Sequence, residues 1–369
     1  MLYQTNNNIQ KFFNEFEWYY KKEFQWIYIN HNDDSQRTVF LGSKDNLSYA
    51  VILKSIKVYL NIYKPLLKEA YFLACVKNNI YFTEIVELFT SDDCQNMYII
   101  MRDEGINLKD FIKYNNFDYN KKIENISRFI VFQTVCGLKF LHDNEFCHND
   151  IKLTNIVISG ACKPKICDLG SISKNQAVKG GGTNGYLSPQ AILDFDRTQK
   201  DDMYAVGIVF LELLNRQTGI FKINGVDDKK QKLKEILEKF YDIKHLNGNW
   251  NDNINYNIIV NLIEIGNYND FEYKLKSNLF RSDENENNKE LIRNLLEINP
   301  ERRMTTNQII NLEMFTNLNF RFEGENNNMK FKEEDYNKYM NSSINDFMEN
   351  IEEIREKVHG DTLLRIGIE

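Results

Sequence analysis

The sequence has no excess of basic residues, no paired cysteine motif and no long apolar run. Its formal net charge is −7, which gives no reason to expect a nucleic-acid partner. None of the six cysteines stands in a CxxC pair, and this favours free thiols in a reducing compartment over disulfides or zinc. No stretch approaches the ~18 apolar residues of a membrane span. Residues 1–16 lack a basic region followed by an apolar one, so we expect no secretory signal and an intracellular protein, cytoplasmic or nuclear.

Hydrophobic residues make up 42% of the 369 positions, which is enough for a sizeable core in one two-lobed domain or two smaller ones. An alternation of period two predicts strands in the first third of the chain, with one helix among them. The predicted strands are 26–31, 37–42, 48–55, 84–90 and 97–102, and the helix is 64–78. We expect a small strand-rich lobe over residues 26–104.

After Gly105 the pattern becomes helical, which predicts a larger helical lobe over residues 105–320. Its predicted helices are 121–142, 199–215 and 289–298, with Asn- and Lys-rich insertions at 217–290. An amphipathic helix is expected at 9–24, within an N-terminal extension of residues 1–25. The C-terminal extension, 321–369, carries an apolar stripe that predicts a helix over 343–358 with one face to bury. That face can dock on the chain's own surface or on a partner. The stripe is Met340, Ile344, Phe347, Ile351, Ile354 and Val358.

Three polar motifs follow one another in the central part of the chain. The first is HNDIKLTNIVI from His148 to Ile158, which places Lys152 two residues and Asn155 five residues after Asp150. Such an arrangement suits phosphoryl transfer, which needs a hydroxyl acceptor, a cation and a metal ligand. Asp168-Leu169-Gly170 follows, and then a segment from Gly182 to Gln190. In this order and spacing the motifs resemble those of the eukaryotic protein kinase family.

The resemblance covers about residues 26–315 and implies an α+β fold of two lobes, a β-rich N-lobe and a helical C-lobe. It further implies a lysine on the third strand, paired with a glutamate on the first helix. Tyr49-Ala50-Val51 would place Ile52 at the lysine position, but the spacing from Val39 favours Lys54 instead. Glu69 is the expected partner of Lys54.

The family pattern also implies a set of nucleotide and metal contacts. Asn155 and Asp168 would supply oxygen ligands to Mg²⁺, which suit that hard ion. ATP would be contacted by residues of the small lobe and of the segment that follows it. These are Val39, Ile52, Lys54, Met101 as gatekeeper, Arg102, Glu104 and Asn107.

Further matches concern the peptide-positioning region. Thr183 resembles the threonine that bonds to the catalytic aspartate and lysine, and Asp202 resembles the aspartate that holds the catalytic-loop backbone. Arg303 resembles an arginine that normally pairs with a glutamate. Here Gln190 stands in the glutamate position, which predicts a neutral hydrogen bond in place of an ion pair.

Two departures from the family pattern bear on activity and control. The three glycines of the nucleotide loop are absent, since their positions fall at Asn32, Asp34 and Arg37. Asp33 and Asp34 in this loop would add negative charge near the phosphates, which predicts weakened ATP binding. Asn149 replaces the arginine that receives a phosphorylated activation segment, and an amide offers no charge to a phosphate. Control by phosphorylation of that segment is therefore not expected.

We interpret the chain as a kinase that transfers phosphate from ATP to Ser or Thr of a protein substrate. Asp150, Lys152, Lys54, Glu69 and Thr183 are its expected catalytic residues. The main alternative is a pseudokinase that acts as a scaffold or allosteric partner, and a small-molecule kinase on the same fold is third.

Overall fold

The computed structural model describes residues 25–31, 37–43, 51–57, 63–90, 96–114, 120–158, 163–245, 248–251, 254–316 and 329–366. The chain divides into two compact units, which are described one at a time. The first unit takes in Met1–Asn78, Thr83–Asp103 and Lys330–Glu369, and the second takes in Asn79–Phe82 and Glu104–Met329. The predicted helix at 9–24 lies outside the described residues. Among the described helices, none has the length and apolar character needed to cross a membrane.

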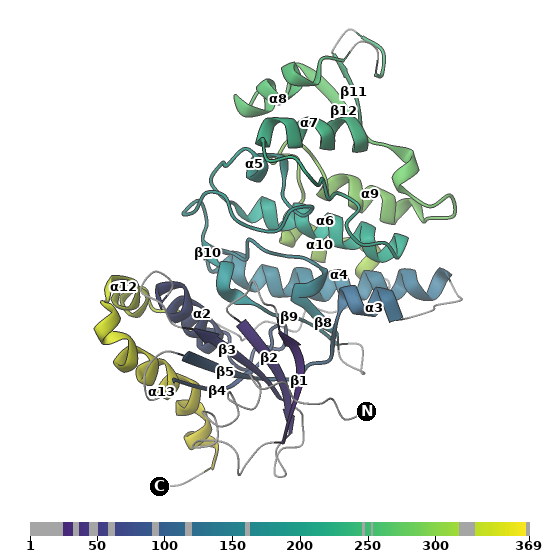
Figure 1. Ribbon diagram of the computed structural model, residues 1–369. Coiled ribbons are helices and arrows are strands. Elements are labelled where there is room, and N and C mark those ends of the chain that lie inside the picture. Colours follow the sequence, from purple (N-terminus) through teal and green to yellow (C-terminus); the bar gives the residue numbers. More distant parts are fainter. Residues whose placement is uncertain are drawn as a thin grey trace. The chain divides into compact units, whose positions relative to one another are not determined.

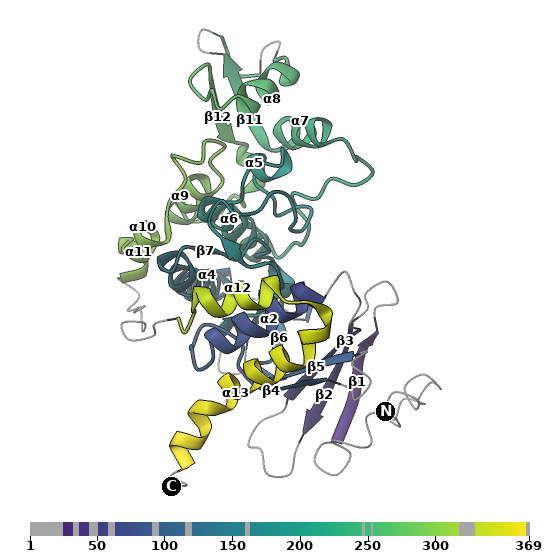
Figure 2. The ribbon, with the colours of Figure 1, turned by 90° about the vertical axis from the view of Figure 1, so that its left-hand side faces the viewer.

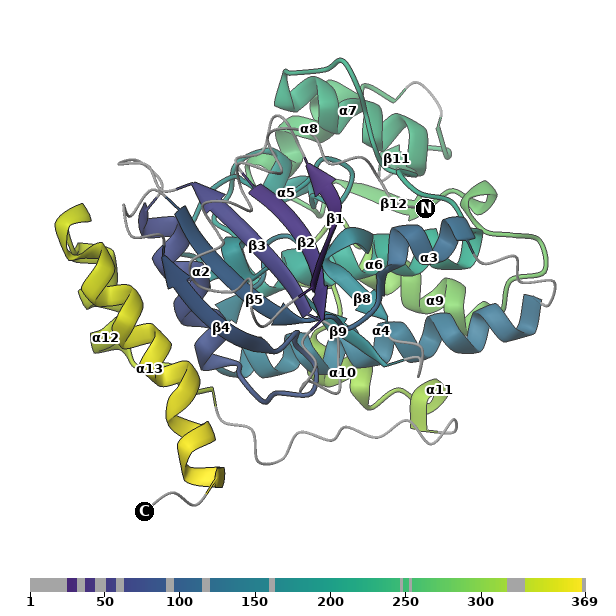
Figure 3. The same ribbon diagram turned by 60° about the horizontal axis from the view of Figure 1, so that its bottom comes forward.

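An antiparallel five-stranded sheet forms the first unit together with helix α2 (Tyr63–Cys75). Figure 3 shows its strands side by side, in the order β1-β2-β3-β5-β4. The strands are β1 (Gln25–His31), β2 (Arg37–Ser43), β3 (Val51–Lys57), β4 (Ile85–Thr90) and β5 (Asn96–Arg102). The predicted small lobe of five strands and one helix therefore agrees with the structure. The predicted helix 64–78 was too long, because α2 ends at Cys75 and Asn78 has a left-handed backbone with φ of 70°.

The C-terminal segment belongs to this same unit (Figures 1 and 2). It consists of α12 (Glu333–Asn341), a short 3-10 turn at Ile344–Asp346 and α13 (Phe347–Ile366). Helix α12 packs on α2, and α13 packs on α2 and β4. The last four residues of the predicted apolar stripe are buried there: Phe347, Ile351, Ile354 and Val358.

Two helices that pack on each other form the centre of the second unit, α4 (Asn120–Asp143) and α6 (Gln199–Asn215) (Figure 1). Both match the predicted helices to within one residue at each end. Helix α6 is buried over most of its circumference, and α9 (Glu286–Leu295) packs on it. Gly207 allows the close approach, since a Cβ there would lie 2.8 Å from the Cβ of Leu295.

Short elements around α4 and α6 carry the loops of interest. They are β6 (Ile106–Asn107), α3 (Leu108–Tyr114), β7 (Phe146–Cys147), β8 (Ile156–Ile158), β9 (Pro164–Ile166), β10 (Ser173–Lys174), α5 (Pro189–Ile192), α10 (Thr306–Ile310) and α11 (Glu313–Thr316). Strands β6, β8 and β9 form one small sheet, and β7 pairs with β10. This pairing places the loop between β7 and β8 beside the segment that follows β9.

The region 217–290 contains more regular structure than its composition predicts. Helices α7 (Lys229–Phe240) and α8 (Tyr256–Glu264) pack on each other, and α7 also packs on the first strand of a two-stranded antiparallel sheet. The strands β11 (Tyr241–His245) and β12 (Phe271–Leu275) were missed, because each is only five residues long and lies within an Asn- and Lys-rich region. The predicted helix 289–298 begins earlier, at Glu286, because the side chain of Asn285 caps it.

Candidate active site

Asp202 fixes the backbone of the loop between β7 and β8 from the first turn of α6. Its carboxylate accepts hydrogen bonds from the backbone N–H groups of His148 and Asn149, each at 2.8 Å. His142 Nε2 lies 3.0 Å from Asp202 Oδ2. Burial alone raises the pKa of Asp202, but the hydrogen bonds from His142 and the backbone lower it below the ordinary value overall. The carboxylate is therefore held charged in a buried place, where it anchors the loop.

Next to the backbone that Asp202 holds, four of the predicted site residues are joined by hydrogen bonds. Thr183 Oγ1 donates to Asp150 Oδ1 at 2.6 Å, and Lys152 Nζ donates to Asp150 Oδ2 at 2.6 Å and to Thr183 Oγ1 at 2.8 Å. Asn155 Nδ2 donates to the backbone oxygen of Asp150 at 2.9 Å and to its Oδ2 at 3.1 Å. We call Asp150, Lys152, Asn155 and Thr183 the catalytic cluster. All of its members belong to the second unit.

The residues expected to hold a metal ion are neighbours through the backbone. Cys167 N donates to Asn155 O at 2.9 Å, which sets Asp168 next to Asn155. Because the amide nitrogen of Asn155 is engaged by Asp150, its amide oxygen faces away from that carboxylate. Asp168 has a left-handed backbone with φ of 61°, a strained conformation that frequently marks a functional residue. One amide oxygen and one carboxylate fit Mg²⁺, which keeps several water and phosphate ligands.

Asn149 has a structural use that its sequence position did not reveal. Its side-chain nitrogen donates to Ser171 O at 2.9 Å and to Ser173 Oγ at 2.8 Å, and its backbone is left-handed with φ of 67°. Asparagine tolerates this conformation better than most residues. The residue thus ties the loop to the segment after Asp168 by short neutral contacts.

The second cluster of predicted residues lies in the first unit. Lys54 on β3 forms an ion pair and hydrogen bond with Glu69 on α2, and both side chains are buried. In the register of the sheet, Lys54 pairs with Val39 of β2, and Ile52 pairs with Met101 of β5. Ile52 and Lys54 share a face of β3, because side chains alternate along a strand. The choice of Lys54 over Ile52 as the paired lysine agrees with this geometry.

The remaining predicted nucleotide contacts occupy the end of β5 and the residues after it. Arg102 lies near Glu84, with 3.8 Å between Nη1 and Oε2, and Glu104 accepts from Lys165 Nζ at 2.6 Å. Asn107 starts α3, since its Oδ1 accepts from Asp110 N at 3.0 Å. Asn32 and Asp34 of the predicted nucleotide loop lie outside the described residues.

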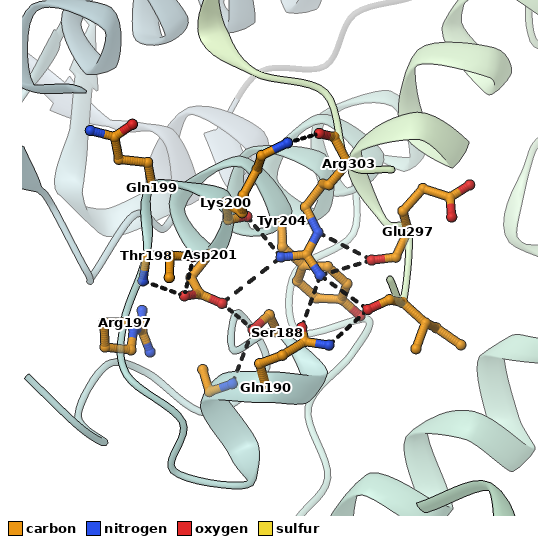
Figure 4. A network of polar contacts seen from close by, with 12 residues as sticks. Ser188, Gln190, Arg197, Thr198, Gln199, Lys200, Asp201, Tyr204, Glu297 and Arg303 are labelled. Carbon is orange, nitrogen blue, oxygen red and sulfur yellow. Dashed lines mark hydrogen bonds and ion pairs between the residues drawn. The ribbon is translucent and has the colours of Figure 1, made fainter. Parts of the chain in front are cut away.

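Arg303 forms the centre of a buried polar network (Figure 4). Its Nη2 donates to Gln190 Oε1 at 3.0 Å and to Glu297 O at 2.8 Å, and its Nη1 donates to Lys200 O at 2.9 Å. The predicted neutral bond between Gln190 and Arg303 is therefore present. Sequence reasoning missed Asp201, whose Oδ1 lies 3.9 Å from Arg303 Nη1 and supplies the negative charge that Gln190 lacks.

Comparisons with known proteins agree with this geometry. Residues 36–315 match the protein kinase domain. Mitogen-activated protein kinase 12 of Rattus norvegicus is 31% identical over 152 residues, which are 40% of this chain and 39% of that protein. Extracellular signal-regulated kinase 1 of Dictyostelium discoideum is 29% identical over 48% of this chain and 36% of its own length. A probable serine/threonine-protein kinase MRK1 homolog of Encephalitozoon cuniculi is 35% identical over 36% of this chain and 41% of its own length. The matched segments span about two fifths of each relative.

Proposed function

Because this chain belongs to the protein kinase domain family, we propose that it transfers the γ-phosphate of ATP to Ser or Thr of a protein substrate. The observation that carries the proposal is the catalytic cluster, in which Lys152 and Thr183 both contact the carboxylate of Asp150. A threonine and a lysine that share one aspartate orient its two oxygens, so that the carboxylate can receive a substrate hydroxyl.

The proposed reaction uses Asp150 as the acceptor of a proton. The substrate hydroxyl oxygen attacks the γ-phosphorus while its proton passes to an oxygen of Asp150, and the bond from phosphorus to the bridging oxygen of ADP breaks. Lys152 lies 2.6 Å from the Asp150 carboxylate and can offset negative charge on the transferred group. Thr183 belongs to the segment expected to position the substrate peptide, and its hydroxyl orients the Asp150 carboxylate.

Two other groups would hold the nucleotide. Asn155 and Asp168 would hold Mg²⁺, which when bound neutralises charge on the phosphates. Lys54 would contact the phosphates of ATP, and its ion pair with Glu69 holds the ammonium group in a fixed place on β3. The residue types expected for proton acceptance, phosphate contact and metal binding are all present, which disfavours the pseudokinase alternative.

Two measurements on the full chain test this function. We expect the melting temperature to rise with ATP and Mg²⁺ together, and we expect labelled phosphate to pass from ATP to the Ser or Thr of a generic protein. Lys179→Met is a suitable control, because this lysine is exposed and outside the catalytic cluster. A melting shift without transfer to any protein would instead support a nucleotide-binding pseudokinase.

A further inference from the structure

Arg197 is a buried arginine that stands just before α6 and that no motif singled out. Only 3% of its surface is exposed. Among the residues that the structure describes, no carboxylate forms an ion pair with it, and its Nε has no hydrogen-bond partner. A buried cation without a carboxylate partner is costly, so its position needs another physical reason.

The guanidinium group instead contacts the backbone of two loops. Its Nη2 donates to Asn149 O at 3.0 Å, and its Nη1 approaches Gly181 O at 3.4 Å. Asn149 directly precedes Asp150, and Gly181 lies two residues before Thr183. One side chain therefore joins the two segments whose polar side chains meet in the catalytic cluster.

The backbone of Arg197 holds the same segment. Gln176 N donates to Arg197 O and Arg197 N donates to Val178 O, both at 2.8 Å. Lys179 and Asp196 form an antiparallel bridge beside these bonds. Gly182 completes the close fit. It has φ of +84°, and a Cβ there would lie 3.0 Å from Asn149 O and 2.8 Å from a methyl group of Leu187.

We propose that Arg197 is a positioning residue that holds residues 176–182 on the catalytic loop, so that Thr183 reaches Asp150 without phosphorylation. The proposal rests on the proposed kinase function. Asn149 cannot bind a phosphate strongly, but its backbone oxygen accepts a charged hydrogen bond from Arg197. The catalytic loop has no cation at position 149. Arg197, in the segment before α6, supplies one instead, and it binds backbone carbonyl groups in place of a phosphate.

Arg197→Met and Arg197→Lys test the role of the guanidinium group. Methionine keeps an unbranched apolar stem and removes the charged guanidinium, whereas lysine keeps the charge and loses the second donor arm. Lys179→Met is the matched control on the same segment, because its ammonium is exposed and 3.8 Å from Asp196. Amide hydrogen exchange of residues 174–183, calorimetric titration of ATP with Mg²⁺ and the kcat and KM for a protein substrate are measured for each protein.

For Arg197→Met we expect exchange in residues 174–183 to rise by about tenfold or more, while exchange in α4 and α6 stays unchanged. Phosphate transfer should fall by about tenfold or more, with ATP affinity within about twofold of wild type. Arg197→Lys should recover part of both losses, and Lys179→Met should behave as wild type. Phosphatase treatment of the wild type should change neither readout.

Unchanged exchange and unchanged transfer in Arg197→Met would overturn the proposal, and so would a wild type that phosphatase silences. If Arg197→Met does not fold, exchange in Arg197→Lys decides in the same way. A wild type that transfers no phosphate would refute the proposed function alone, because the exchange experiment needs no activity.

Discussion

At the residue scale, Asp202 of the buried helix α6 holds the backbone that immediately precedes Asp150. One carboxylate satisfies the backbone N–H groups of His148 and Asn149 and contacts His142. An asparagine at position 202 could accept from only one of the two N–H groups and would turn its own N–H₂ towards the other. We expect Asp202→Asn to lower the free energy of unfolding by about 3 kcal/mol at neutral pH.

The difference in unfolding free energy between wild type and Asp202→Asn should depend on pH, because the pKa of Asp202 is lowered in the folded protein. An acid whose pKa is lower in the folded state stabilises the fold above its unfolded pKa, and this contribution is lost as pH falls through the folded value. The gap between wild type and Asp202→Asn should therefore narrow below about pH 4, the ordinary range for aspartate. Urea unfolding of both proteins, measured at steps of about one pH unit from about pH 3 to about pH 7, checks this. A difference in unfolding free energy that widens on acidification would contradict it.

Asp150 and Asp168 carry different expected roles, which nucleotide binding separates. Asp168 is the expected metal ligand, whereas Asp150 is held by Lys152 and Thr183 and is the expected acceptor of the substrate hydroxyl proton. We expect Asp168→Ala to weaken Mg²⁺-dependent ATP binding by about tenfold or more, and Asp150→Asn to change it by less than about threefold. Calorimetric titration with and without Mg²⁺ measures both. Equal losses in the two variants would refute this division of roles.

At the element scale, helix α2 is covered on one side by the sheet and on another by the C-terminal segment. Tyr71 of α2 accepts from Lys332 N at 2.8 Å and donates to Lys332 O at 3.0 Å. Arg355 of α13 donates to Glu87 of β4 at 3.0 Å. The same helix carries Glu69, whose pairing with Lys54 depends on the placement of α2. The C-terminal segment therefore supports the helix from which this pair is built.

A single substitution in α13 tests that support. Ile354 is fully buried, so Ile354→Ala should lower the free energy of unfolding by about 2–4 kcal/mol and reduce phosphate transfer. Glu356 is exposed on the same helix, and Glu356→Ala should change the stability by less than about 0.5 kcal/mol. Deletion of residues 330–369 should have a larger effect than either. Urea unfolding and transfer assays at a temperature where all variants are folded decide this, and a harmless deletion would show that α2 needs no such support.

The nucleotide loop remains a prediction from sequence, because positions 32 and 34 lie outside the described residues. A carboxylate ~5 Å from a phosphate, at an effective dielectric of about 20, would oppose ATP binding by up to about 3 kcal/mol. Asn32→Gly, Asp34→Gly and Arg37→Gly combined should therefore tighten binding of ATP with Mg²⁺, by up to about two orders of magnitude. Calorimetry of the triple variant measures the gain. Tight binding by the wild type, with no gain from the glycines, would exclude this explanation.

Local patterns in the sequence predicted helices α4 and α6, because each has a long apolar repeat. They also predicted the strands of the first sheet, where the period shifts towards two between turn residues. The catalytic cluster was also predictable, since Asp150, Lys152 and Asn155 lie within six residues and the family motif fixes their order. Arg197 was not, because its partners lie 16 and 48 residues away and no local repeat surrounds it. The short strands β11 and β12 escaped for a related reason. Each is only five residues long, and its partner strand lies about 30 residues away in the chain, so neither stood out from its Asn- and Lys-rich surroundings.

At the scale of the whole molecule, the two units carry separate parts of one proposed reaction. The first unit holds the Lys54–Glu69 pair, and the second holds the catalytic cluster with Asn155 and Asp168. Asn149 and Arg197 replace a charged phosphate clamp by hydrogen bonds to backbone and serine groups. We propose that this combination lets the active arrangement form without phosphorylation.

Transfer of labelled γ-phosphate from ATP with Mg²⁺ to a protein, compared between wild type and Asp150→Asn, tests the central claim most directly. Asparagine has nearly the same shape as aspartate but cannot take up the hydroxyl proton, and Asp150→Asn should still bind ATP. We expect transfer to Ser or Thr by the wild type and a loss of about a hundredfold or more in the variant. Equal transfer by the two proteins, or none by a wild type that binds ATP with Mg²⁺, would contradict the assignment of this chain as an active protein kinase.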